Sequence, residues 1–88
     1  MQHILIIEDD RIIAESIEFV LEKDSFSCQW FNNGSESLNY LDNNKVDLIL
    51  LDVGLPDMSG FDVLRKVRLK SNIPVIIISA RDDESDQV

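Results

Sequence analysis

Residues 46–52 read Val-Asp-Leu-Ile-Leu-Leu-Asp, and residues 53–56 continue as Val-Gly-Leu-Pro. A nearly continuous apolar run is typical of a strand that is buried on both faces, as parallel strands are. Glycine and proline directly afterwards end the strand. The carboxylate of Asp52 is therefore predicted at the carboxyl end of a central strand, where open α/β sheets place their ligand sites.

A second group of acids, Glu8-Asp9-Asp10, follows another apolar run at residues 4–7. If the two strands are parallel neighbours, their terminal acids meet at one edge of the sheet. Converging carboxylates repel each other, so they require a divalent cation or a raised pKa. An alternative interpretation makes residues 8–10 only a helix cap with acids in the first turn. That alternative does not explain why a second strand ends in an acid at the same edge.

Strand and helix patterns alternate along the chain. Strands are predicted at residues 3–7, 27–31, 47–51 and 75–78, and helices at 10–23, 35–43 and about 59–70, with a fourth helix from Asp82. This alternation indicates right-handed crossovers and a parallel sheet in an α/β fold. Helical spacing predicts the inward-facing residues as Ile13, Ile17, Val20 and Leu21, then Leu38 and Leu41, then Phe61, Leu64 and Val67.

Two apolar surfaces lack an expected cover. Residues 75–78 are as apolar as a central strand, and nothing that follows them in the 88 residues covers their outer edge. Ile12 and Phe19 form a further apolar stripe on the first helix. We therefore expect a missing strand and helix. The 88-residue chain is then not a stable monomer, and a homodimer or an exchange of elements through residues 75–78 is expected.

Composition limits the class of protein. The 88 residues suffice for one domain, and 17 acidic against 8 basic residues give a net charge of −9. Nucleic-acid binding by this segment is not expected, because it requires a basic patch. We expect no membrane segment and no signal peptide. The single cysteine, Cys28, excludes an internal disulfide and favours a reducing cytoplasm.

Three motifs in order resemble a known family. They are Ile-Leu-Ile-Ile-Glu-Asp-Asp at 4–10, Asp-Leu-Ile-Leu-Leu-Asp-Val-Gly-Leu-Pro-Asp-Met-Ser-Gly at 47–60, and Pro-Val-Ile-Ile-Ile-Ser-Ala-Arg at 74–81. The chain resembles the receiver domain of bacterial two-component response regulators. The resemblance implies a flavodoxin-like (CheY-like) α/β fold with helices on both faces of a parallel sheet in strand order 2-1-3-4.

The resemblance also implies a site and its chemistry. Asp52 corresponds to the phosphoacceptor, and Ser79 to a hydroxyl that donates a hydrogen bond to the phosphoryl group. Mg²⁺ is implied at Asp9, Asp52 and the backbone carbonyl of Gly54, with Glu8 acting through a coordinated water. Asp10 is expected to cap the following helix instead.

The family's partners and missing parts are implied in the same way. A sensor histidine kinase donates the phosphoryl group, and the parent protein is expected to carry a DNA-binding output domain that regulates transcription. The domain is a phosphoacceptor, not an enzyme with turnover. The family also uses a lysine and an aromatic residue on a fifth strand. Since the 88 residues contain no such strand, residues 1–88 are expected to be a receiver domain that is incomplete at its C-terminal end.

Three alternative functions would explain part of this pattern. A degenerate or truncated receiver acts only as an interaction module. A Mg²⁺-dependent phosphatase with an aspartate nucleophile requires a second aspartate two residues after the first, where this chain has Gly54. A flavin-binding flavodoxin requires hydroxyls and amides after the first strand, where this chain has acids.

Overall fold

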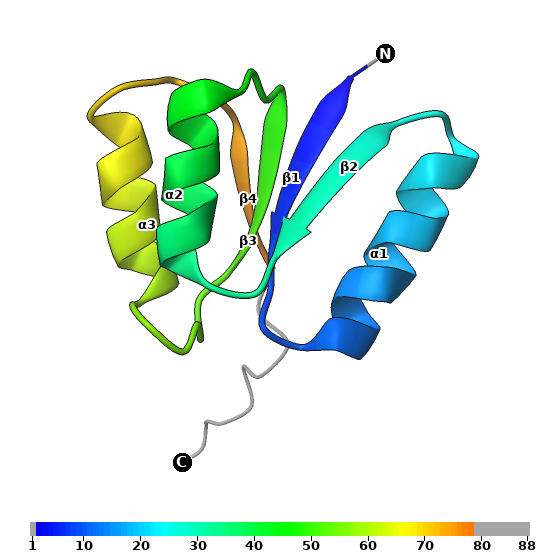
Figure 1. Ribbon diagram of the computed structural model, residues 1–88, viewed down its shortest axis with the longest axis horizontal. Helices are drawn as coiled ribbons and strands as arrows, with labels where there is room; N and C mark the ends of the chain where they lie inside the picture. Colours follow the sequence, from blue (N-terminus) through cyan, green and yellow to red (C-terminus); the bar gives the residue numbers. More distant parts are fainter. Residues whose placement is uncertain (1, 79–88) are drawn as a thin grey trace.

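The computed structural model describes residues 2–78, in which strands and helices alternate (Figure 1). The elements are β1 (His3–Ile7), α1 (Arg11–Lys23), β2 (Ser27–Phe31), α2 (Gly34–Asn43), β3 (Leu48–Asp52), α3 (Gly60–Arg68) and β4 (Val75–Ile78). The predicted elements of this part of the chain are confirmed, and their ends agree to within two residues. The helix expected from Asp82 lies outside the described residues.

The four strands form one parallel sheet in the order β2-β1-β3-β4. The implied strand order 2-1-3-4 is therefore confirmed. β1 and β3 are central and pair in register, with Ile7 opposite Leu51. Because both strands end at the same edge of the sheet, the acids that follow or close them come together there.

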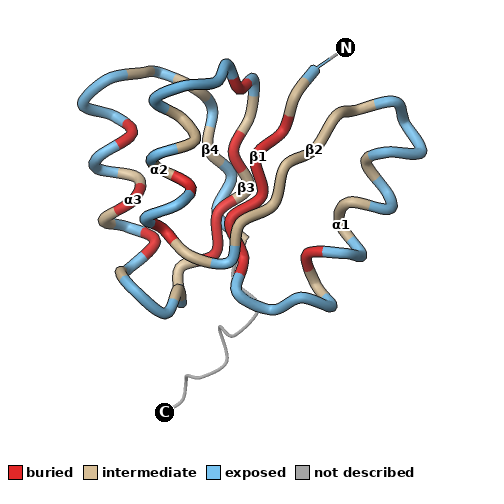
Figure 2. Tube along the Cα trace, viewed as in Figure 1, coloured by how far each residue is buried: buried red, intermediate tan, exposed pale blue. Residues whose placement is uncertain are grey.

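Helices cover both faces of the sheet, as the resemblance implied. Figure 1 shows α1 on one face and α2 with α3 on the other. The α2–α3 face contains the larger core, which consists of Leu5, Ile7, Val46, Ile49, Leu51, Val63 and Val67. The α1 face contains Ile4, Ile6 and Ala14. The residues coloured as buried in Figure 2 are accordingly concentrated in β1 and β3.

Each helix begins at a polar cap. The Asp10 carboxylate accepts hydrogen bonds from the backbone N–H groups of Ile12 and Ile13, at 2.9 and 3.3 Å. This confirms the cap expected at Asp10. Asn33 caps α2 and Ser59 caps α3 in the same way. These caps satisfy N–H groups that a helix leaves without intrahelical partners.

The predicted inner faces of two helices need correction. Phe61 is 53% exposed, and the buried residues of α3 are Gly60, Val63 and Val67. Gly60 packs against the backbone after β3, which fixes the rotation of α3 and turns Phe61 about 100° away from it. Val20 is likewise exposed, because α1 turns Ala14 toward the sheet.

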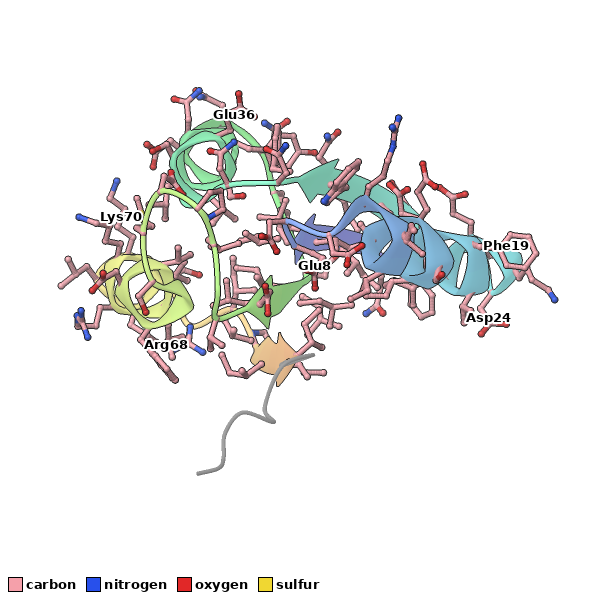
Figure 3. The ribbon with its side chains drawn as sticks, turned by 90° about the horizontal axis from the view of Figure 1, so that it is seen from below. Glu8, Phe19, Asp24, Glu36, Arg68 and Lys70 are labelled. Carbon is pink, nitrogen blue, oxygen red and sulfur yellow. The ribbon has the colours of Figure 1, made fainter. Side chains whose placement is uncertain are left out.

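The two surfaces expected to lack a cover are exposed within residues 2–78. Ile12 and Phe19 are 75% and 65% exposed on the outer side of α1. Figure 3 shows Phe19 at the far side of that helix. On β4, the side chains of Ile76 and Ile77 are also exposed. The apolar pattern on β4 therefore does not correspond to burial among the described residues.

Candidate functional site

Three acids gather at the carboxyl edge of the sheet. Glu8 and Asp9 follow β1, and Asp52 is the last residue of β3. One carboxylate oxygen from each of the three lies within 4.8 Å of the others. Glu8 and Asp52 are buried, whereas Asp9 is exposed. Figure 3 shows Glu8 in the middle of the molecule, between the two helical layers. The predicted convergence of these acids is therefore observed.

Backbone contacts on both sides fix the position of Glu8. Its N–H donates to the carbonyl of Phe31 at 3.1 Å, and its carbonyl accepts from the indole N–H of Trp30 at 2.7 Å. Its carboxylate oxygen Oε2 accepts from the N–H of Asp10 at 3.0 Å. The other oxygen, Oε1, is buried and has no hydrogen-bond partner within residues 2–78. A buried carboxylate oxygen in this state is costly unless it is protonated or meets a cation.

The electrostatics of the site agree with this geometry. Burial raises the pKa of the Glu8 carboxyl from 4.5 to about 7. The hydrogen bond from Asp10 lowers this pKa, and the negative charges of Asp52 and Asp9 raise it. Between pH 4.5 and about 7, Glu8 of the metal-free cluster therefore keeps a proton that an ordinary glutamate has lost.

A tight loop fixes the backbone directly after Asp52. The N–H of Gly60 donates to the carbonyl of Val53 at 2.9 Å, and Gly54 forms an isolated bridge with Ser59. A Cβ atom at residue 60 would lie 2.5 Å from the carbonyl oxygen of Asp52. Only glycine permits this approach, so the start of α3 is held against the residue that carries the buried carboxylate.

Asp57 has a role that the sequence interpretation missed. Its carboxylate accepts hydrogen bonds from the N–H of Gly34 at 2.8 Å and from the N–H and hydroxyl of Ser35 at 2.9 and 2.8 Å. The bond from Gly34, with those from Ser35, lowers the pKa of Asp57. The loop after β3 is therefore attached to the first turn of α2. The signal in the sequence was the helix start at Gly34, whose free N–H groups favour an anion.

The other predicted site residues divide into two groups. Gly54 lies two residues after Asp52, in the loop that follows β3, and is exposed. Ser79 lies outside the described residues. Within residues 2–78, no helix is long and apolar enough to cross a membrane.

The chain belongs to the response regulator receiver domain family, whose pattern its residues 4–88 match. The chain is 40% identical to the sensory transduction protein RegX3 of Mycobacterium tuberculosis over 88 residues. This alignment covers 100% of this chain and 39% of RegX3. The transcriptional regulatory protein CseB of Streptomyces coelicolor is 38% identical over 86 residues, which are 98% of this chain and 37% of CseB. The chain thus spans about two fifths of these relatives, and the expected incompleteness of residues 1–88 stays a prediction.

Solved structures confirm the fold. The CheY-like receiver domain protein of Methanospirillum hungatei has a TM-score of 0.85 at 30% identity, over 90% of this chain and 64% of that one. The response regulator TrrA of Thermotoga maritima, solved with Mg²⁺ and beryllium fluoride, has a TM-score of 0.87 at 27% identity, over 94% and 73% of the two chains. The resemblance suggested by the three motifs is therefore confirmed as family membership.

Proposed function

We propose that Asp52 of this chain accepts a phosphoryl group from a sensor histidine kinase and thereby regulates an attached output domain. The observation that carries the proposal is the meeting of Glu8, Asp9 and Asp52 within 4.8 Å at the carboxyl edge of the two central strands. Asp52 is the only one of the three that closes a strand, and the backbone after it is fixed by Gly60.

The donor set fits Mg²⁺. All three side chains offer carboxylate oxygens, which Mg²⁺ prefers as protein ligands, and Glu8 Oε1 is a buried oxygen without a hydrogen-bond partner in residues 2–78. We propose that Asp9, Asp52 and the carbonyl of Gly54 hold the ion directly and that Glu8 acts through a water. The bound ion supplies charge neutralisation for an incoming phosphoryl group.

The chain's own residues then provide the nucleophile and its orientation. A carboxylate oxygen of Asp52 forms a bond to phosphorus while the bond from phosphorus to the kinase histidine nitrogen breaks, which yields an acyl phosphate. Positioning contributes most to such a transfer. It comes here from β3, from the close contact with Gly60 and from the attachment of the loop by Asp57. The chain itself receives the phosphoryl group and does not pass it to a substrate, so we propose no enzymatic turnover.

Signal output and location are part of the same proposal. RegX3 and CseB are named as sensory transduction and transcriptional regulatory proteins, which supports a DNA-binding output domain in the parent protein. The segment itself, with its net charge of −9, is not proposed to contact nucleic acid. We place the chain in the cytoplasm, where a histidine kinase would phosphorylate it. The outer edge of β4, where Ile76 is exposed, stays the proposed place for pairing or exchange between copies.

Phosphorylation by a small donor tests the proposal. In the full-length parent protein, we expect acetyl phosphate and Mg²⁺ to give an acid-labile mass gain of one phosphoryl group, which borohydride trapping and peptide mapping should locate at Asp52. Asp52→Asn should abolish the gain. Asp47→Asn, at the opposite end of the same apolar run, should retain it. Label on Asp9 or Asp10 would contradict the assignment, and no reaction at all would favour a pure interaction module. Continuous release of phosphate would favour the phosphatase alternative.

A further inference from the structure

A surface between α2 and α3 is lined by none of the three acids of the cluster, Glu8, Asp9 and Asp52. Between the C-terminal ends of α2 and α3, at the amino edge of the sheet, the structure contains a hollow of about 550 Å³. Its floor is apolar and includes Leu38, Leu41, Val46 and Val67, and its rim carries Lys45, Lys66 and Lys70. This size lies in the range of roughly 300–1,000 Å³ that is typical of ligand sites.

A second hollow extends this surface along α3. It has a volume of about 540 Å³ and is lined by Met58, Asp62, Arg65, Lys66 and Leu69. The two hollows share Lys66 and Leu69. We call their combined surface the α2–α3 channel. An elongated surface of this kind suits a segment of polypeptide better than a compact small molecule.

The charge of the channel is opposite to that of the chain. Four basic residues line the two hollows, Lys45, Arg65, Lys66 and Lys70, against two acidic ones, Asp42 and Asp62, in a molecule with a net charge of −9. Figure 3 shows Lys70 on the side of α3 toward α2, and this lysine pairs with Asp42 at 3.0 Å. Lys45 and Lys66 form no salt bridge within residues 2–78. The α3 dipole favours a cation at Lys66, but Lys45 follows α2 in a loop and has no such reason.

An exposed apolar side chain lies among these cations. Leu69 is 84% exposed and lines both hollows. An exposed leucine beside an apolar floor and two lysines without ion pairs combines the two features that recognise an acidic amphipathic segment. Carboxylates of such a segment would meet Lys45 and Lys66, and its apolar side chains would cover Leu69 and the floor.

We propose that the α2–α3 channel binds an acidic amphipathic helix of a partner protein. The helix presents leucine-type side chains to the floor and glutamate or aspartate side chains to Lys45 and Lys66. The first hollow, with Lys45 and Lys66, lies at the amino edge of the sheet, and the acidic cluster at Glu8 lies at the carboxyl edge. The second hollow reaches Met58 in the loop after β3, but neither hollow is lined by an acid of the cluster. The proposal therefore does not depend on phosphorylation of Asp52.

A synthetic helix is the first probe. We would titrate the isotope-labelled chain with a peptide that has leucine at positions i, i+3, i+4 and i+7 and glutamate elsewhere, and follow backbone amide shifts by NMR. Shifts should be confined to α2, α3 and the loops that line the channel. The same peptide with lysine in place of glutamate should not bind. Shifts spread over α1, or equal binding of the lysine peptide, would overturn the proposal.

Paired charge reversals provide the control. The double variant Lys45→Glu/Lys66→Glu should weaken peptide binding by about tenfold, because two exposed ion pairs become repulsive. The matched variant Arg11→Glu/Lys23→Glu changes the net charge equally but on α1, and should change the affinity by less than about twofold. Leu69→Ser should also weaken binding. Equal loss in both double variants would reduce the effect to net charge and overturn the proposal. Binding to phosphatidylglycerol vesicles through Lys45 and Lys66, without peptide binding, would overturn it in favour of a membrane surface.

Discussion

The two faces of the sheet differ in the size of their apolar cores, although both are formed by the same four strands. Within residues 2–78, the α2–α3 face buries seven apolar residues completely or nearly so, whereas the α1 face buries three. The α1 face also leaves Ile12 and Phe19 exposed. Most of the stability of residues 2–78 is therefore expected to come from the α2–α3 side, since burial of apolar area drives folding.

The same difference extends to the acidic site. Its β3 half is held from the α2–α3 side, where Gly60 packs on Asp52 and Asp57 binds the start of α2. Its β1 half is held from the α1 side, where Asp10 begins α1 and also donates its N–H to Glu8. The proposed nucleophile therefore belongs to the more firmly packed half of the molecule.

The largest expected effect on stability comes from two adjacent leucines of β3, which face opposite sides of the sheet. Leu51 is fully buried on the α2–α3 face, and Leu50 is partly buried on the α1 face. Leu51→Ala should lower the free energy of unfolding by about 3–5 kcal/mol, and Leu50→Ala by roughly half as much. Urea denaturation followed by circular dichroism measures both. Equal losses would mean that the two faces contribute equally.

A pH titration of stability tests the acidic cluster, where the β1 half and the β3 half of the site meet. Because Glu8 has a raised pKa of about 7 in the fold against 4.5 when unfolded, the folded state binds the extra proton between these values. Stability should therefore fall as pH rises through this interval, in total by an amount on the order of 3 kcal/mol for the metal-free chain.

The variant Glu8→Gln isolates this effect. Unfolding curves of both proteins in a chelator, from pH 4 to pH 8, should differ by an amount that grows with pH in favour of the variant. Asp52→Asn removes one of the charges that raise the pKa of Glu8. In this variant the free energy of unfolding should therefore fall less steeply with pH than in the unmodified chain. A wild-type stability that rises through the interval, relative to Glu8→Gln, would contradict the assignment.

The smallest expected effect on stability comes from the two aspartates that bind the starts of α1 and α2. Asp57 accepts three hydrogen bonds at the start of α2, and Asp10 accepts two at the start of α1, one of them 3.3 Å long. We expect Asp57→Ala to cost about 1 kcal/mol at neutral pH, and Asp10→Ala somewhat less.

Acid should remove the difference at Asp57. Its pKa is lowered in the fold, so its contribution is present above the ordinary value of 3.8 and is lost as pH falls through the lower folded value. Thermal melts of the variant and the parent should therefore converge in acid. A destabilisation that persists unchanged in acid would show that packing, not the charged hydrogen bonds, is lost.

Much of the fold and half of the site follow from local patterns in the sequence. The apolar runs before Glu8 and Asp52 predict two buried parallel strands, and parallel neighbours necessarily bring their terminal acids to one edge. Asp10, Asn33 and Ser59 are short polar residues in front of helical patterns, so the helix starts were also predictable.

The parts that were not predicted depend on contacts between distant residues. Phe61 and Val63 both fit a helical pattern, and only the packing of Gly60 on the β3 backbone decides which of them faces inward. Asp57 lies 23 residues after the helix start at Gly34 that it binds. Lys45 and Lys66 come from separate segments, so their shared channel becomes visible only when α2 and α3 lie side by side.

The hydrogen bond between Trp30 and the backbone of Glu8 makes the molecule its own optical reporter. Trp30 is the only tryptophan of the chain, and its indole N–H donates directly to the carbonyl of the residue that enters the acidic cluster. Indole emission responds to hydrogen bonding and to nearby charge. A shift of the Glu8 backbone should therefore change the emission of Trp30, so that binding at the cluster can be followed in real time without a dye or a label.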